Sequence, residues 1–433
     1  MTPPSRKHPL RHLRASDLRG VAQLASRATA GISRIAEGVH QAVWSVLGAP
    51  GGATPGSTRG VTGLVYRGIR GASQWLGAGL DKSLAQLEPW LASADAARPE
   101  TPQREAVLAA LNGVLGDRLA QADSPFATPM TLRLRGQVLD WKNPPAPAAV
   151  TVHVVLLVHG LCMNDLQWQA ASPAAADSGR NPPGAASDHG AALAAALGAT
   201  PVYVRYNTGQ HVSHNGQALS ARLEQLVDHW PMALAQITVL AHSMGGLVIR
   251  SAVFHARQQG MRWPARLRSI VFLGTPHHGA PLERAGNWVE VLLGSSRFAA
   301  PFARLAQLRS AGITDLRYGL LLDQDWQGHD RFRRQPDRRH PVPLPEGVAC
   351  YTVAAATAAK RSLLAERLLG DGLVPLASAL GQHAEPGRSL VFARDAQWIA
   401  YRMNHMALLH HPDVTRQLLQ WLAATPGQTA NRS

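Results

Sequence analysis

Residues 237–250 carry the pattern with the clearest chemical meaning in this chain of 433 residues. An apolar and β-branched run, Ile237-Thr-Val-Leu240, leads into Ala241-His-Ser-Met-Gly245, and a helix-forming run follows at once. This order predicts a strand, a sharp turn and a helix that lift the hydroxyl of Ser243 above a parallel sheet. The small residues at both ends of the turn suit its crowding, and Gly246 adds a second glycine. The pattern predicts a serine nucleophile, although so short a motif also occurs by chance.

Such a serine needs a base, a carboxylate that orients the base, and donors for the negative charge that develops on the substrate oxygen. When a nucleophile sits on a strand–turn–helix, the acid and then the base follow it along the chain. We predict His405 as the base because it comes shortly before a helix expected over residues 412–421. The chain has 19 histidines, so position alone is weak evidence. His410 and His411 compete, but they suit the turn before Pro412 better.

Asp371 is the predicted acid. It lies between glycines in Gly370-Asp-Gly-Leu-Val-Pro375, after an expected strand over residues 347–353 and a helical stretch over residues 363–369. A carboxylate on such a loop can bend toward the histidine, although an Asp-Gly pair more often only makes a turn. The competing carboxylates are Asp323, Asp325 and Asp395.

Two backbone amides are the predicted oxyanion donors. The near-continuous apolar run over residues 150–158 indicates a buried parallel strand, which ends in His159-Gly-Leu-Cys162. Gly160 permits a tight turn that aims the amide of Leu161 at a substrate carbonyl. The amide of Met244, at the start of the predicted helix, is the second donor. The alternative is that Gly160 is an ordinary strand-to-loop glycine.

Further residues are predicted to line the substrate site. A strand expected over residues 201–205 ends at Tyr206-Asn-Thr-Gly209, on the same edge of the sheet as the serine. Ligands bind beyond the carboxyl ends of parallel strands, but Asn207 and Gly209 also suit a simple turn. His277, in the loop after the next strand, fits loop packing or site lining. The substrate-binding residues predicted are Gly160, Asn207, His242 and His277.

Together these motifs resemble the α/β-hydrolase superfamily, and within it the bacterial serine esterase and lipase branch. The Ala241-His-Ser-Met-Gly-Gly246 turn is similar to that of bacterial lipases whose first glycine is replaced by alanine. Phe272-Leu-Gly-Thr-Pro-His-His-Gly279 and the segments around Asp371 and His405 are similar to the GPI inositol-deacylase-like family. The resemblance covers residues 150–424. It implies a mostly parallel sheet with helices on both faces and hydrolysis of carboxylic esters, without implying a GPI substrate.

The expected activity is therefore cleavage of lipid or other apolar acyl esters through an acyl-enzyme, with no metal or organic cofactor. Two alternatives stay open. One is thioester or amide hydrolysis by the same three side chains. The other is a non-catalytic, membrane-associated scaffold that keeps the fold.

Length and composition allow a large core with an accessory region, because 45% of the residues are hydrophobic. We expect a helical region over residues 1–130, a strand and Pro-rich hinge over 131–149, the catalytic domain over 150–424 and a flexible tail over 425–433. Two cysteines, Cys162 and Cys350, are too few for a disulfide framework. Without a spanning run or a secretory signal, the expected location is the cytoplasm, with the inner membrane face as a possible peripheral site.

The N-terminal region contains a quasi-repeat with an offset of 40 residues, in which Arg19-Gly-Val21 recurs as Arg59-Gly-Val61. Each copy places apolar residues on one helical face, and a third helix is expected over residues 107–119. Two interpretations compete: the helices pack on the catalytic domain, or they contact an anionic membrane surface. The net charge of +15 favours contact with anions, while the alanine- and glycine-rich faces weaken insertion.

Residues 280–345 form a long insertion, which we expect to cap the site. Its cluster of arginines suits a solvated loop, with phosphate or headgroup contact as the alternative; the members are Arg331, Arg333, Arg334, Arg338 and Arg339. No basic stripe with interleaved aromatic residues is present, so nucleic acid is not an expected partner.

Overall fold

The structure is a computed structural model that describes residues 100–168, 188–280, 310–328, 337–358 and 370–423. The chain divides into two compact units, 1–128 with 289–310, and 129–288 with 311–433. The predicted repeat, the helix over residues 363–369, most of the cap and the C-terminal tail lie outside the described residues, as do three of the five clustered arginines. Among the described residues, no helix is both long and apolar enough to cross a membrane.

The first unit contains α5, Pro102–Gln121, which includes the helix expected over residues 107–119. Proline at its first position suits a helix start, since the amide that proline lacks would have no partner there. Asn112, buried on this helix, donates from Nδ2 to the carbonyl oxygen of Phe126 at 2.7 Å and accepts at Oδ1 from the amide of Thr128 at 2.9 Å. These two bonds fix the chain that follows the helix.

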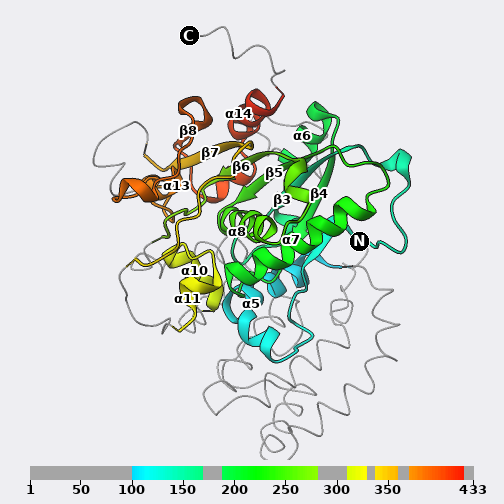
Figure 1. Ribbon diagram of the computed structural model, residues 1–433, viewed down its shortest axis with the longest axis horizontal. Coiled ribbons are helices and arrows are strands. Elements are labelled where there is room, and N and C mark those ends of the chain that lie inside the picture. Colours follow the sequence, from blue (N-terminus) through cyan, green and yellow to red (C-terminus); the bar gives the residue numbers. More distant parts are fainter. Residues whose placement is uncertain (1–99, 169–187, 281–309, 329–336, 359–369, 424–433) are drawn as a thin grey trace, which may run out of the picture. The chain divides into compact units, whose positions relative to one another are not determined.

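The second unit is built on an eight-stranded sheet with the order β2-β1-β4-β3-β5-β6-β7-β8. Strands β3 to β8 run parallel, while β1 pairs antiparallel with β2 and with β4 (Figure 1). The strands are β1 Thr131–Leu134, β2 Gln137–Val138, β3 His153–Val158, β4 Thr200–Arg205, β5 Gln236–His242, β6 Leu267–Leu273, β7 Ala349–Ala356 and β8 Gln397–Tyr401. The fold class predicted from the sequence is confirmed.

Helices cover both faces of this sheet. In Figure 1, α7 and α8 lie side by side over the central strands. On the other face α6 contacts α14. The helices of this unit are α6 His189–Leu197, α7 Val212–His229, α8 Met244–Gln258, α10 Ala311–Tyr318, α11 Asp323–Trp326, α13 Leu376–Ala379 and α14 Pro412–Leu422.

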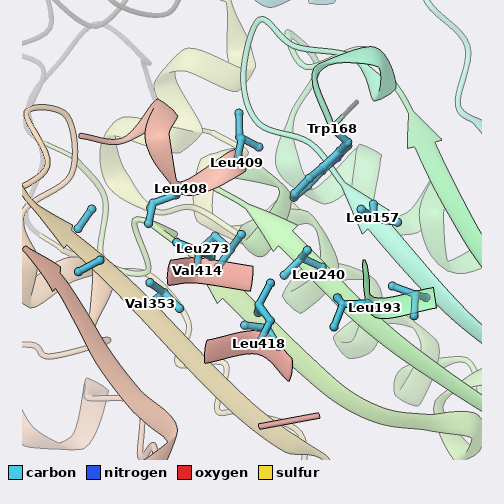
Figure 2. Close-up of a cluster of buried hydrophobic side chains, with 14 of the residues drawn as sticks. Leu157, Trp168, Leu193, Leu240, Leu273, Val353, Leu408, Leu409, Val414 and Leu418 are labelled. Carbon is cyan, nitrogen blue, oxygen red and sulfur yellow. The ribbon is translucent and has the colours of Figure 1, made fainter. Parts of the chain in front are cut away.

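The hydrophobic core under α6 and α14 is formed by alternate strand residues, because successive side chains of a strand point to opposite faces. Figure 2 shows Leu157, Leu240, Leu273 and Val353 pointing toward Leu193 of α6 and toward Val414 and Leu418 of α14. Leu408 and Leu409, from the turn between β8 and α14, join the same cluster. The core thus reaches the turn that carries His405.

Two strands, β3 and β7, begin two or three residues later than expected. β3 begins at His153 rather than at residue 150, because the amide of Thr151 donates to the hydroxyl of Thr200 and its carbonyl accepts from the indole of Trp230. β7 covers Ala349–Ala356 rather than residues 347–353. Gly347, with φ of +74°, turns the chain before the strand starts.

Candidate active site

Ser243 lies on a sharp turn between β5 and α8, as predicted. Its φ and ψ are 53° and −122°, a region that non-glycine residues rarely adopt. The two glycines that follow are required by space: a Cβ on Gly245 would lie 2.5 Å from the carbonyl oxygen of Val158, and one on Gly246 would lie 2.0 Å from Oγ1 of Thr275. The helix can therefore start directly beneath the serine only with glycine at both positions.

His405 and Asp371 form a direct pair. Nδ1 of His405 lies 2.6 Å from Oδ2 of Asp371, and the side chains of both residues are 1% exposed. The amide of His405 also donates to the carbonyl oxygen of Asp371 at 3.3 Å. The other carboxylate oxygen, Oδ1, accepts from the amides of Leu373 and Val374 at 2.9 and 2.7 Å. The loop around Asp371 thus holds the carboxylate in one orientation toward the imidazole.

The competing residues take other roles. Asp323 accepts a hydrogen bond from Gln217 and Asp325 accepts from the amides at the start of α11. Asp395 is exposed on a short 3-10 helix. Nδ1 of His411 accepts from the amide of Asp413 and caps α14, which is the turn role predicted for it.

The serine and the histidine lie at the same edge of the sheet. The amide of Ser243 donates to the carbonyl oxygen of Leu273 at 2.8 Å, and the next residue, Gly274, abuts His405. A Cβ on Gly274 would lie 3.0 Å from both Cε1 and Nδ1 of the imidazole. The ring of His242, next to the serine, has its centroid 4.7 Å from that of His405. The serine turn follows β5, the loop of Asp371 follows β7 and His405 follows β8, so all three residues lie at the carboxyl edge of the sheet.

The loop after β3 also contacts the serine. A Cβ on Gly160 would lie 3.0 Å from Cβ of Ser243, so the backbone of this loop passes directly beside the nucleophile. The loop is anchored by the hydroxyl of Tyr206, which donates to the carbonyl oxygen of His159 at 2.7 Å, and by the amide of Cys162, which donates to Oγ1 of Thr208. This placement suits Leu161 as an oxyanion donor, and Met244 is the first residue of α8.

Cys162 lies in the same loop but is an unsuitable nucleophile. Burial raises the pKa of its thiol to about 12, so the reactive thiolate is not formed near neutral pH. Both cysteines are free, as expected. Among the described residues, no group of three or more His, Cys, Asp or Glu side chains could hold a metal ion.

Asn207, one of the predicted substrate-binding residues, is hydrogen-bonded within the protein. Oδ1 of Asn207 accepts from the amide of Gly209 at 3.0 Å. The backbone carbonyl oxygen of Asn207 accepts from Nδ2 of Asn215 at 2.9 Å. These bonds correspond to the turn that was the alternative interpretation of Asn207. The neighbouring His211 contacts both carboxylate oxygens of Asp315 on α10 at 3.0 Å. A role for Asn207 in binding substrate stays a prediction.

His277 is buried between aromatic rings and Arg250. Its ring meets Phe272 edge-on at 4.8 Å, and its Nδ1 lies 3.4 Å from a guanidinium nitrogen of Arg250. Burial, followed by the charge of Arg250, holds the pKa of His277 well below its usual value. Arg250 also donates to the carbonyl oxygen of Val342. The sequence carried no signal for this contact, because Arg250 is one of many arginines on predicted helices.

A mostly parallel sheet with a serine on the turn after β5 and an Asp–His pair beyond β7 and β8 has the architecture of the α/β-hydrolase superfamily. Residues 149–340 match the model of the PGAP1-like alpha/beta domain. This match confirms the resemblance drawn from the motifs up to His277, while Asp371 and His405 lie beyond the matched residues. No curated protein matches the chain.

Solved structures with similar folds include the mature lipase BlEst2 of Bacillus licheniformis, at 18% identity and a TM-score of 0.40 over 69% of this chain and 98% of that one. Lipase B of Aspergillus fumigatus gives 10% identity and a TM-score of 0.40 over 96% and 87%. The naproxen esterase of Bacillus subtilis gives 12% identity and a TM-score of 0.33 over 64% and 85%.

Proposed function

We propose that this protein is a serine hydrolase that cleaves carboxylic esters with Ser243, His405 and Asp371. The observation that carries the proposal is the 2.6 Å contact between Nδ1 of His405 and Oδ2 of Asp371, beside a serine on a strained turn. A carboxylate so placed fixes the imidazole tautomer with its proton on Nδ1, which makes Nε2 the basic nitrogen. That is the protonation state that a general base for serine requires.

The reaction then follows the usual order for such a group of residues. Nε2 of His405 takes the proton of Ser243 while Oγ attacks the carbonyl carbon, and the amides of Leu161 and Met244 stabilise the oxyanion. The imidazolium returns its proton to the leaving alcohol, and an acyl-serine remains. Water, activated by the same imidazole, releases the acid and restores the enzyme. Oγ of Ser243 has no hydrogen-bond partner among the described residues, so no competing bond has to be broken before His405 engages it.

The surroundings support an apolar acyl group as substrate. Apolar atoms lie next to the two glycines that border Ser243 and His405: a Cβ on Gly160 would lie 3.3 Å from Sδ of Met163, and one on Gly274 would lie 2.9 Å from Cδ1 of Leu408. Ser243 itself is 1% exposed, so a substrate must leave water to reach it. Desolvation of that kind favours long, apolar acyl esters over small polar ones. Thioesters carry the same acyl groups and are the second candidate class.

A fluorophosphonate probe tests the nucleophile. We expect the full chain to be labelled covalently and the Ser243→Ala variant to be inert. Cys162→Ala is the matched control for the neighbouring thiol and should label like the parent chain. Failure of the parent chain to label would favour the non-catalytic scaffold.

A series of p-nitrophenyl esters of increasing acyl length tests the substrate class. We expect kcat/KM to rise from acetyl to octanoyl and longer chains. A preference for acetyl or butyryl esters would contradict the apolar-substrate proposal while leaving the serine mechanism intact.

A further inference from the structure

His242 has a position that the triad alone does not explain. It is the last residue of β5, directly before Ser243, and is fully buried. Its Nε2 lies 3.2 Å from the carbonyl oxygen of His405, a residue 163 positions away. Because a carbonyl oxygen can only accept, His242 must carry its proton on Nε2 and donate it. The residue next to the nucleophile is thus bonded to the backbone of the predicted base.

We propose that His242 is a positioning residue that holds the backbone of His405 so that its imidazole faces Ser243. This inference rests on the proposed function of the triad. With it, His405 is held at three atoms: its carbonyl oxygen by Nε2 of His242, and its amide nitrogen and Nδ1 by the backbone and side chain of Asp371. These contacts leave the imidazole little freedom, so the end of β5 and the loop around Asp371 together set where Nε2 lies relative to Ser243.

Neighbouring residues hold in place the imidazole ring of His242 that donates to His405. Its centroid lies 6.4 Å from that of Trp168, which meets it edge-on, and 4.7 Å from that of His405. A Cβ on Gly160 would lie 3.1 Å from Nδ1 of His242, so the loop beside the serine closes over the ring. His242 thereby links the predicted oxyanion loop, the nucleophile and the base. Its predicted contact with substrate stays a separate prediction.

The proposed role also requires that the ring of His242 carries no charge. Burial, and then the nearby charge of His405, hold the pKa of His242 well below its usual value. The ring of His242 therefore remains neutral while His405 accepts the proton of Ser243. A second positive charge at this distance would oppose formation of the imidazolium.

Two amide substitutions distinguish loss of the hydrogen bond from His242 to His405 from loss of packing by the His242 side chain. His242→Gln keeps an N–H donor at the ε position, whereas His242→Asn moves the donor to the δ position, short of the carbonyl. We expect His242→Asn to lower kcat by about 100-fold with KM changed less than about threefold, because small misplacements of a catalytic group have effects of this size. His242→Gln should recover at least tenfold of that loss. The rates are normalised to active sites counted by fluorophosphonate labelling, so misfolded protein does not contribute.

His278→Leu is the matched control. Its Nε2 also donates to a carbonyl oxygen, that of Gly381 at 3.0 Å, but that carbonyl belongs to no residue of the triad. We expect its kcat per labelled site to stay within twofold of the parent chain. Equal kcat in His242→Asn and the parent chain, or equal losses in the Asn and Gln variants, would overturn the proposal. Absence of labelling in the parent chain would instead overturn the proposed function, so the two failures are distinct.

Discussion

Asp371 uses its two carboxylate oxygens for different purposes. Oδ1 accepts two backbone amides, which shape the loop, and Oδ2 contacts Nδ1 of His405. The loop bonds explain why an Asp-Gly turn and a triad acid are not exclusive interpretations of this residue. One side chain can serve both, because each role uses a different oxygen.

Replacing Asp371 by Asn should therefore separate the two roles. The amide oxygen can still accept from Leu373 and Val374, but the amide nitrogen cannot accept from Nδ1–H of His405. The imidazole is then driven to the tautomer with its proton on Nε2, which cannot accept the serine proton. We expect kcat on p-nitrophenyl esters to fall by about 10,000-fold with little change in the urea midpoint of unfolding. Asp395→Asn, at the exposed rival carboxylate, is the control; activity within tenfold of the parent in Asp371→Asn would assign the acid elsewhere.

At the scale of elements, the loop after β6 controls how closely His405 approaches the sheet. Gly274 has φ of +58°, and its Cα faces the imidazole and Leu408. The turn carrying His405 can pack into this position only because no side chain stands there. The same loop supplies Thr275 to the glycines of the serine turn.

Gly274→Ala should displace the base. A Cβ would lie 3.0 Å from the ring of His405, so the ring must shift by a few tenths of an ångström, and we expect kcat to fall about 10- to 100-fold. Gly260→Ala is matched in backbone strain, with φ of +63° and no atom within 4 Å of the added Cβ. Both should lose about 1 kcal/mol of stability from the positive φ, but only Gly274→Ala should lose activity. Equal kcat in the two variants would show that the loop tolerates a side chain there.

The local parts of this site were predictable and the distant contacts were not. Ser243 is fixed by a few contiguous residues whose sterics are visible in the sequence. His405 could be placed by its distance from a strongly patterned helix. The bond from His242 to the backbone of His405 depends instead on how β5 and the turn after β8 align in the sheet, which no local pattern encodes. The sequence around Asn207 likewise suits both a turn and a substrate pocket, because the hydrogen-bond partners of Asn207 cannot be read from the sequence.

At the scale of the whole molecule, several histidines are buried in their neutral form. His189, fully buried at the start of α6, donates from Nε2 to the carbonyl oxygen of Leu408 and accepts at Nδ1 from the hydroxyl of Thr415. His159, the first residue after β3, is also fully buried. Burial lowers the pKa of each of these two histidines to about 4.

These depressed values predict a strong acid dependence of stability. In the unfolded chain the histidines bind protons near pH 6.5, but in the folded chain only near pH 4. The stability that neutral His189 supports is therefore complete above pH 6.5 and is lost as the pH falls toward 4, by on the order of 3 kcal/mol. Urea unfolding between pH 4 and 7 should show this slope, and His189→Gln should flatten it. Identical slopes in the two proteins would exclude His189 as the cause.

The net charge of +15 leaves two interpretations of the N-terminal region, packing on the catalytic domain and contact with anionic membranes. Co-sedimentation with phosphatidylserine vesicles separates them when the full chain is compared with a variant in which Arg6, Lys7, Arg11 and Arg14 are replaced by Gln. Membrane contact predicts that binding of the full chain weakens with added salt and that the variant binds more weakly than the full chain. Equal binding supports packing.

The three side chains of the site are spread over residues 243 to 405, and the last of them follows the final strand of the sheet. A nascent chain that has emerged from the ribosome only as far as β7 holds the serine and lacks both of its partners. Its hydroxyl is then an ordinary alcohol. Under the proposed mechanism, the order of the strands along the chain thus withholds reactivity during translation until nearly the whole sheet has been synthesised.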